Sequence, residues 1–302
     1  MKSYFQFKFE TYKLILRFFL FSTFFLLIGC ESDSDSSKHS ANNQVSLGIN
    51  TSSYSNMDVG GKLLLDTLFI ITEEAQAEFL ELEKTPYSVV DSLVKEINAT
   101  MLRSHIDTSK VRLVGIHTLK DADYIRTGHS PGAALENINY MEEWLGTYRN
   151  AYGADKIILI ASTSESGNSN AWGRAPELVS MYVSFLPFEH EFGHTMGLGD
   201  CSENQGLKFE TLNPSLTGGT RMCGNNNGFY SNPKIFLNMN EVEDLVQQGL
   251  MVNQNYREIL GDDYIFPMGG VDGDFDSVGV WQTNELASAN HYPSTMPINN
   301  IT

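Results

Sequence analysis

Hydrophobic and polar residues along the chain form two kinds of pattern, which predict strands and helices in alternation. Short runs that are almost wholly apolar, or that alternate with polar residues, are typical of strands, and they occur at residues 63–71, 111–116, 157–160 and 178–185. Apolar residues repeated every three or four positions are typical of one buried helix face, and they occur at residues 90–101 and 138–152. The sequence therefore predicts an α/β fold, a mixed sheet with helices packed on it, with a loop at residues 167–174.

The first 29 residues have the pattern of an export signal. A basic segment precedes an uncharged run from Phe18 to Gly29, and this run is shorter than the roughly 20 apolar residues that span a bilayer. The run ends in Leu-Ile-Gly followed by Cys30, which resembles the lipobox of bacterial lipoproteins. That resemblance implies cleavage before Cys30, acylation of this residue, and anchoring to a membrane of the bacterial cell envelope, at its periplasmic face or at the cell surface. The alternative is an ordinary signal or an uncleaved anchor in which Cys30 occurs by chance.

The composition and net charge of the chain limit the kinds of molecule that it is expected to bind. The chain has 302 residues and a net charge of −17, from 37 acidic and 20 basic residues. A nucleic-acid-binding protein needs a basic face for phosphates, so we expect no nucleic-acid partner. Residues 30–61 are rich in Ser and Asn and are too polar to bury a core, so they are expected to form a flexible tether to the anchor.

The candidate chemistry lies between His190 and Asp200. His190 and His194 are four residues apart, which places both imidazoles on one face of a helix, where they can bind a single zinc ion. Glu191 follows the first His and is suited to take a proton from water at that metal. Pro187 is expected to be the first helical residue, and Gly197 is expected to end the helix and return Asp200 to the metal as third ligand. Three protein ligands leave a coordination position for water, as in catalytic zinc sites.

This pattern, His-Glu-x-x-His-x-x-Gly-x-x-Asp, resembles the signature of the metzincin zinc peptidases. Further segments, at residues 65–75, 152–160, 172–175 and 229–233, resemble bacterial reprolysin-like members of that family. The resemblance implies a mixed twisted sheet with two long helices, an active-site helix and a smaller irregular lower subdomain. It also implies that residues 152–160 form the edge strand that pairs with substrate, and that Met222 forms the Met-turn beneath the metal.

The chain departs from the family pattern at the third ligand and after the Met-turn. Asp200 stands where most metzincins have His, although a carboxylate is an ordinary zinc ligand. Gly224 stands where some members have a Tyr that steadies the reaction intermediate. An alternative for the third ligand is another residue, such as His129, with Asp200 hydrogen-bonded to a ligating His.

Two further sets of residues have candidate roles. Cys201 follows the third ligand and Cys223 follows Met222, so a disulfide between them is expected in an oxidising envelope, with two unpaired buried thiols as the alternative. Acidic residues alternate at Asp272, Asp274 and Asp276, but the glycine and glutamate of a calcium loop are missing, so a solvated acidic turn is preferred to a calcium site.

These observations predict an anchored zinc endopeptidase that hydrolyses extracellular or envelope proteins. Its expected organisation is a signal peptide at 1–29, a tether at 30–61, a catalytic domain at 62–245 and a C-terminal extension of unknown role at 246–302. The expected partners are a protein or peptide substrate and the membrane. The alternatives are a catalytically inactive surface lipoprotein of the same fold, acting as a binding protein or adhesin, and another zinc hydrolase with the same helix.

Overall fold

The computed structural model describes residues 57–119, 146–162, 172–174, 178–183, 186–201, 206–223 and 228–289. These residues belong to one compact unit, Ile49–Thr302. The predicted signal peptide, Cys30 and most of the predicted tether lie outside the described residues. Within the described part, no helix has the length and hydropathy needed to cross a membrane.

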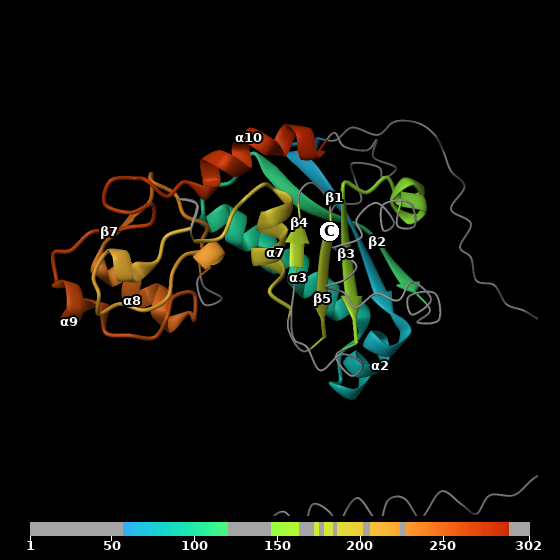
Figure 1. Ribbon diagram of the computed structural model, residues 1–302, viewed down its shortest axis with the longest axis horizontal. Coiled ribbons are helices and arrows are strands. Elements are labelled where there is room, and N and C mark those ends of the chain that lie inside the picture. Colours follow the sequence, from blue (N-terminus) through green and yellow to red (C-terminus); the bar gives the residue numbers. More distant parts are fainter. Residues whose placement is uncertain are drawn as a thin grey trace, which may run out of the picture. The chain divides into compact units, whose positions relative to one another are not determined.

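A five-stranded sheet of order β2-β1-β3-β5-β4 forms the centre of the fold (Figure 1). Its parallel strands are β1 (Leu63–Thr72), β2 (Ser109–Leu119), β3 (Lys156–Ala161) and β5 (Leu178–Tyr182). The fifth strand, β4 (Trp172–Arg174), pairs antiparallel with β5 at the edge. The predicted α/β class with a mixed sheet is confirmed, and each of the four predicted strands is present.

Two predictions about this sheet are wrong. The loop predicted at residues 167–174 includes β4, a strand of three residues that is too short for any alternation to show. The edge strand expected at residues 152–160 is instead β3, which lies between β1 and β5. Its fully buried sequence is suited to that interior place, because a strand covered on both faces is apolar throughout.

Alternate residues of the central strands contribute to two hydrophobic clusters, one on each face of the sheet. Phe69 and Ile158 belong to the larger cluster, which includes side chains from the helices α2, α3, α7 and α10. Leu68 and Leu159 belong to the smaller one, against which Tyr148 and Tyr152 pack. The sheet is therefore covered on both sides, as the apolar composition of its strands requires.

Two of the helices on the larger cluster, α2 and α3, begin with side-chain caps. Helix α2 (Glu73–Glu81) was not predicted, and starts directly after β1 with Thr72 as its N-cap. Helix α3 (Pro86–Arg103) contains the predicted helix at 90–101 and begins with a capping box formed by Thr85 and Ser88. Of the second predicted helix, residues 146–152 are helical and the remainder lies outside the described residues.

The C-terminal part of the chain is built from short elements around a third cluster that includes Phe209, Tyr256 and Phe266. These elements are η2 (Phe209–Thr211), η3 (Arg221–Cys223), β6 (Phe236–Leu237), α8 (Met239–Gln247), α9 (Tyr256–Leu260) and β7 (Phe266–Pro267). The last helix, α10 (Ser277–Ala289), returns to the sheet and contacts β1 (Figure 1). Part of the predicted C-terminal extension therefore packs on the same hydrophobic cluster as α7, the helix that carries His190 and His194.

Candidate metal centre

The helix α7 (Phe188–Thr195) carries the two candidate histidine ligands. Pro187 is its N-cap rather than its first helical residue, so the prediction for Pro187 is wrong by one position, because the chain turns into the helix one residue later. His190 and His194 lie one turn apart, with their ring centroids 4.9 Å apart. Both rings are mostly buried, with 18% and 20% of their side-chain surface exposed.

A tight turn follows α7 and carries the chain to Asp200. The helix ends at Thr195 with Met196 as C-cap, and Gly197 has a φ of +80°, a conformation that only glycine adopts at low cost. The backbone N–H of Leu198 donates to the Gly193 carbonyl, which closes the turn. Gly197 therefore acts as the sequence predicts.

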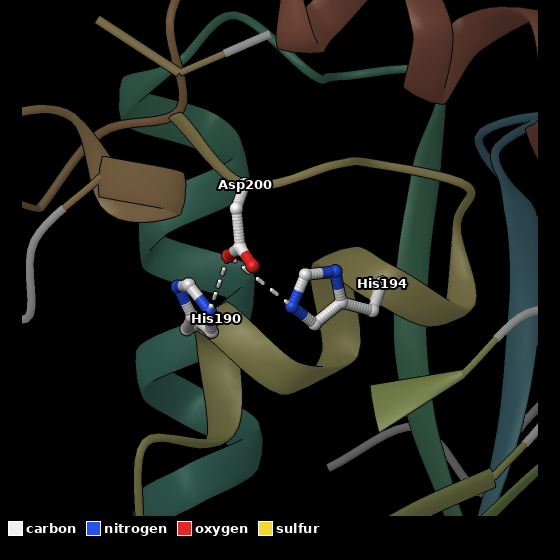
Figure 2. A group of neighbouring side chains, drawn as sticks. All are labelled: His190, His194 and Asp200. Carbon is white, nitrogen blue, oxygen red and sulfur yellow. Dashed lines mark ion pairs between the residues drawn. The ribbon is translucent and has the colours of Figure 1, made fainter. Parts of the chain in front are cut away.

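The three candidate ligand atoms converge (Figure 2). Oδ1 of Asp200 lies 3.2 Å from Nε2 of His190 and 3.6 Å from Nε2 of His194. Zinc bonds of about 2.0–2.1 Å at tetrahedral angles separate two ligand atoms by about 3.4 Å. The two distances to Asp200 are therefore compatible with a tetrahedrally coordinated zinc ion, and among the described residues Asp200 is the side chain that joins the two histidines. His129 lies outside the described residues.

Backbone carbonyls orient both imidazole rings. Nδ1 of His190 donates to the Arg221 carbonyl at 3.0 Å, and Nδ1 of His194 donates to the Leu198 carbonyl at 2.7 Å. A carbonyl oxygen only accepts hydrogen bonds, so each Nδ1 carries the proton. In the neutral ring the lone pair then belongs to Nε2, which faces Asp200.

The electrostatics of the group favour a cation between its members. Burial is the largest cause that lowers the pKa of His190, so its imidazole is neutral at pH 7. Nε2 of the neutral His190 then presents a lone pair to Oδ1 of Asp200, since the ring proton is on Nδ1. A cation between these two atoms is attracted by both. In the described part of the chain, no other group of three His, Cys, Asp or Glu side chains brings its ligand atoms together in this way.

Accessibility differs between the ligands. Asp200 exposes 64% of its side chain, whereas the two imidazoles are mostly covered. Glu191, the candidate proton carrier, is buried within α7 with 5% of its surface exposed. A group with three protein ligands and one accessible side is suited to a catalytic metal, because such sites keep a coordination position for water or substrate.

Met222 packs directly against the helix that carries the histidines. It is 1% exposed, and a Cβ atom added to Gly193 would lie 2.6 Å from its Sδ. Gly193, between the two histidines, therefore has no room for a side chain while Met222 is in place. The adjacent Cys223 forms a disulfide with Cys201, the residue after Asp200.

Residues that the sequence analysis missed support α7 from below. Glu189 forms an ion pair with Arg221 at 3.5 Å, and the hydroxyl of Tyr230 donates to the Glu189 carbonyl. Burial is the largest cause that raises the pKa of Tyr230, so this hydroxyl keeps its proton. Tyr230 lies in the segment 229–233 that carries the family resemblance, but no motif predicts these contacts, because they join segments that are distant in the sequence.

The acidic residues considered for calcium have another role. Asp276 accepts a hydrogen bond from the backbone N–H of Gly279 at 2.7 Å, in the first turn of α10. Asp272 and Asp274 are not gathered with it into a candidate metal group among the described residues. The structure thus gives no support to a calcium loop, and Asp276 caps a helix instead.

Comparisons with known proteins find structural similarity without sequence similarity. No protein-family model and no curated protein matches the chain. A solved structure described as a chaperone–substrate complex matches with 18% identity and a TM-score of 0.52, over 77% of this chain and 35% of that chain. Metalloproteinase-II from Bacteroides fragilis matches with 13% identity and a TM-score of 0.31, over 65% of this chain and 55% of that chain. The chain thus spans about a third of the first of these solved chains and about half of the second. The first match shows that another protein has a similar fold.

Proposed function

We propose that this chain is a zinc-dependent endopeptidase. The observation that carries the proposal is the convergence of His190, His194 and Asp200, with spacings of 3.2 and 3.6 Å to the carboxylate oxygen. Zinc bound there supplies Lewis acidity, which polarises a peptide carbonyl and makes water acidic near neutral pH.

Glu191 is the proton carrier in this proposal. It follows a ligand on α7 and is not a member of the metal-ligand group. Its carboxylate accepts a proton from the attacking water and then delivers that proton to the leaving amine.

The edge of the sheet supplies a place for an extended peptide. In the described residues, β4 pairs with β5 alone, and β4 also contacts α7 (Figure 1). A peptide added along an exposed strand edge gains main-chain hydrogen bonds whatever its sequence. Such binding next to the ligand helix favours cleavage within a chain, and therefore a protein or peptide substrate.

Anchoring to the cell envelope remains part of the proposal on sequence grounds alone. It depends on the pattern at residues 1–30, which lies outside the described residues. An anchored peptidase on an acidic chain would act on proteins outside the cytoplasm.

The test compares Glu191→Gln with Asp200→Ala in the full chain. Zinc content is measured by elemental analysis, and cleavage is measured on a peptide library with and without a zinc chelator. Glu191→Gln is expected to keep zinc and to lose about 10²- to 10⁴-fold in rate, whereas Asp200→Ala is expected to lose both zinc and cleavage. Glu81→Gln, the same change at an exposed residue of α2, serves as control.

The outcomes separate the proposed enzyme from its alternatives. Undiminished cleavage by Glu191→Gln would reject the role of Glu191. A wild-type chain that binds zinc and cleaves no peptide would favour the inactive binding protein instead.

A further inference from the structure

We propose that Asn284, in the C-terminal helix α10, is a positioning residue for the metal site. It acts by fixing the turn after α7, on which the orientation of His194 and the place of Asp200 both depend. This inference rests on the zinc site of the proposed function and extends it to a residue that lies outside the motif.

The end of α7 needs hydrogen-bond donors from outside the helix. The last carbonyls of a helix have no partner within it, and here the turn itself satisfies only part of them. The Thr195 carbonyl accepts from Nζ of Lys156 at 3.0 Å. The Met196 carbonyl accepts from Nδ2 of Asn284 at 3.0 Å. Two side chains that are distant in sequence therefore complete the helix end.

Lys156 shows how strongly this end of the helix is held. Its side chain is fully buried in the first position of β3, and its Nζ also lies 3.3 Å from Oγ of Ser288 in α10. A buried ammonium group is costly unless it is well hydrogen-bonded. The sheet and α10 thus meet at the C-terminal end of α7.

Asn284 also packs on the turn. A Cβ atom added to Gly197 would lie 2.7 Å from Nδ2 of Asn284. Gly197 has a positive φ, so the turn has an uncommon conformation that must be held against more ordinary ones. Asn284 therefore contacts the turn and bonds to the carbonyl that precedes Gly197.

The turn affects two of the three ligands. Its Leu198 carbonyl accepts from Nδ1 of His194 at 2.7 Å, and the chain reaches Asp200 two residues later. Groups that orient metal ligands typically change metal affinity or activity about 10- to 100-fold when they are removed. Releasing the turn is expected to loosen both ligands together.

Helix α10 has other attachments that do not involve Asn284. Trp281 is fully buried, stacks on Phe192 of α7 with centroids 5.9 Å apart, and donates from Nε1 to Oγ of Ser109. Glu285 accepts from Oγ1 of Thr108 at 2.9 Å. These contacts are expected to keep α10 docked when Asn284 is changed, so that positioning can be measured apart from folding.

The experiment uses the full chain with Asn284→Asp, which keeps the shape and replaces the donor by an acceptor, and Asn284→Ala, which adds no charge. Gln282→Glu and Gln282→Ala, on the exposed side of the same helix, are the matched controls. Zinc affinity is measured by competition with a chromophoric chelator. The visible spectrum of the Co²⁺-loaded protein reports ligand geometry, and thermal unfolding without metal reports stability.

Both Asn284 variants are expected to bind zinc about 10- to 100-fold more weakly than wild type and to alter the Co²⁺ spectrum, while both controls match wild type. Wild-type affinity and spectrum in the two Asn284 variants would overturn the inference and leave the proposed function in place. A lower unfolding temperature with an unchanged Co²⁺ spectrum would also overturn it, because the role would then be structural only. A wild-type chain that binds no zinc would overturn both proposals.

Discussion

Replacing Gly193 by alanine tests the packing beneath the proposed metal site. The new Cβ would lie 2.6 Å from Sδ of Met222, 3.2 Å from Cδ1 of Leu198 and 3.3 Å from Cε of Met222. The first distance is too short for an unbonded carbon and sulfur, so the Met222 side chain has to move. Because Met222 is 1% exposed, it has little space into which to move.

Two effects of opposite sign determine the stability change. An alanine within a helix is favoured over glycine by about 0.8–1.0 kcal/mol. Forcing an extra methyl group into a packed core costs about 1–3 kcal/mol. Gly193→Ala is therefore expected to lower the free energy of unfolding by up to about 2 kcal/mol.

A double-mutant cycle with Met222→Ala isolates the clash. Met222→Ala alone is expected to cost about 2–5 kcal/mol, and it removes the atoms that Gly193→Ala would meet first. On that background Gly193→Ala is expected to stabilise the fold by up to about 1 kcal/mol, so the coupling between the two sites is about 1–3 kcal/mol.

Denaturant unfolding of metal-free protein measures all four members of the cycle. Gly146→Ala is the control, since Gly146 is also helical and, among the described residues, its added Cβ would meet only the end of Arg149, at 3.7 Å. This control is expected to be neutral or stabilising. The same stability change for Gly193→Ala with and without Met222 would refute the placement of Met222 against α7.

Two other perturbations have calculable directions. Replacing Cys201 and Cys223 together by alanine is expected to lower the free energy of unfolding by about 3 kcal/mol, because the disulfide closes a loop between residues 22 positions apart. Denaturant titrations measure this difference. Equal stability of the variant and the wild type would argue against the disulfide. Burial lowers the pKa of His117, whose ring centroid lies 4.3 Å from that of Tyr148. The His117 imidazole therefore binds a proton more readily in the unfolded chain than in the folded one, and stability is lost as the pH falls below 6.5. His117→Phe is therefore expected to weaken the pH dependence of the unfolding temperature between about pH 7 and 5, and an unchanged dependence would exclude His117 as its cause.

The local hydrophobic pattern was enough to predict most of the central sheet. β1 and β3 are apolar over most of their length, because each is covered on both faces. The buried exceptions Asp66 and Lys156 have polar partners, the Arg112 guanidinium and the Thr195 carbonyl. The edge strand β4 has no such constraint. It has three residues and forms only by pairing with β5, so its existence depends on tertiary structure and not on its own pattern.

The C-terminal helix was not predicted for a similar reason. Its buried face includes Ser277, Glu285 and Ser288 as well as apolar residues, so a search for apolar periodicity finds little. These polar residues are buried because each has a partner elsewhere in the fold, as Glu285 has in Thr108. Partners of this kind have no signal in a single sequence.

The candidate metal site, too, could be predicted only in part from the sequence. Its ligand set could be predicted because His190 and His194 are neighbours on one helix face and Asp200 follows a single turn. Several contacts that support this site could not be predicted, because they come from groups distant in the sequence. The carbonyl that orients His190 belongs to Arg221, 31 positions away, and a backbone carbonyl is the same in every residue.

The candidate ligands of the motif and the residues that hold them in place therefore have different roles. Three acceptor atoms held together repel one another when no cation lies between them, so some other contacts must hold them in place. The imidazoles are fixed by carbonyls, while Asp200 is largely exposed and depends on its backbone. That backbone is held on one side by the turn beneath Asn284, 88 positions from Met196, and on the other by the disulfide of Cys201. If zinc binds as proposed, changes to the candidate ligands are expected to remove it, whereas changes to these distant supports are expected to leave it bound more weakly and in altered geometry.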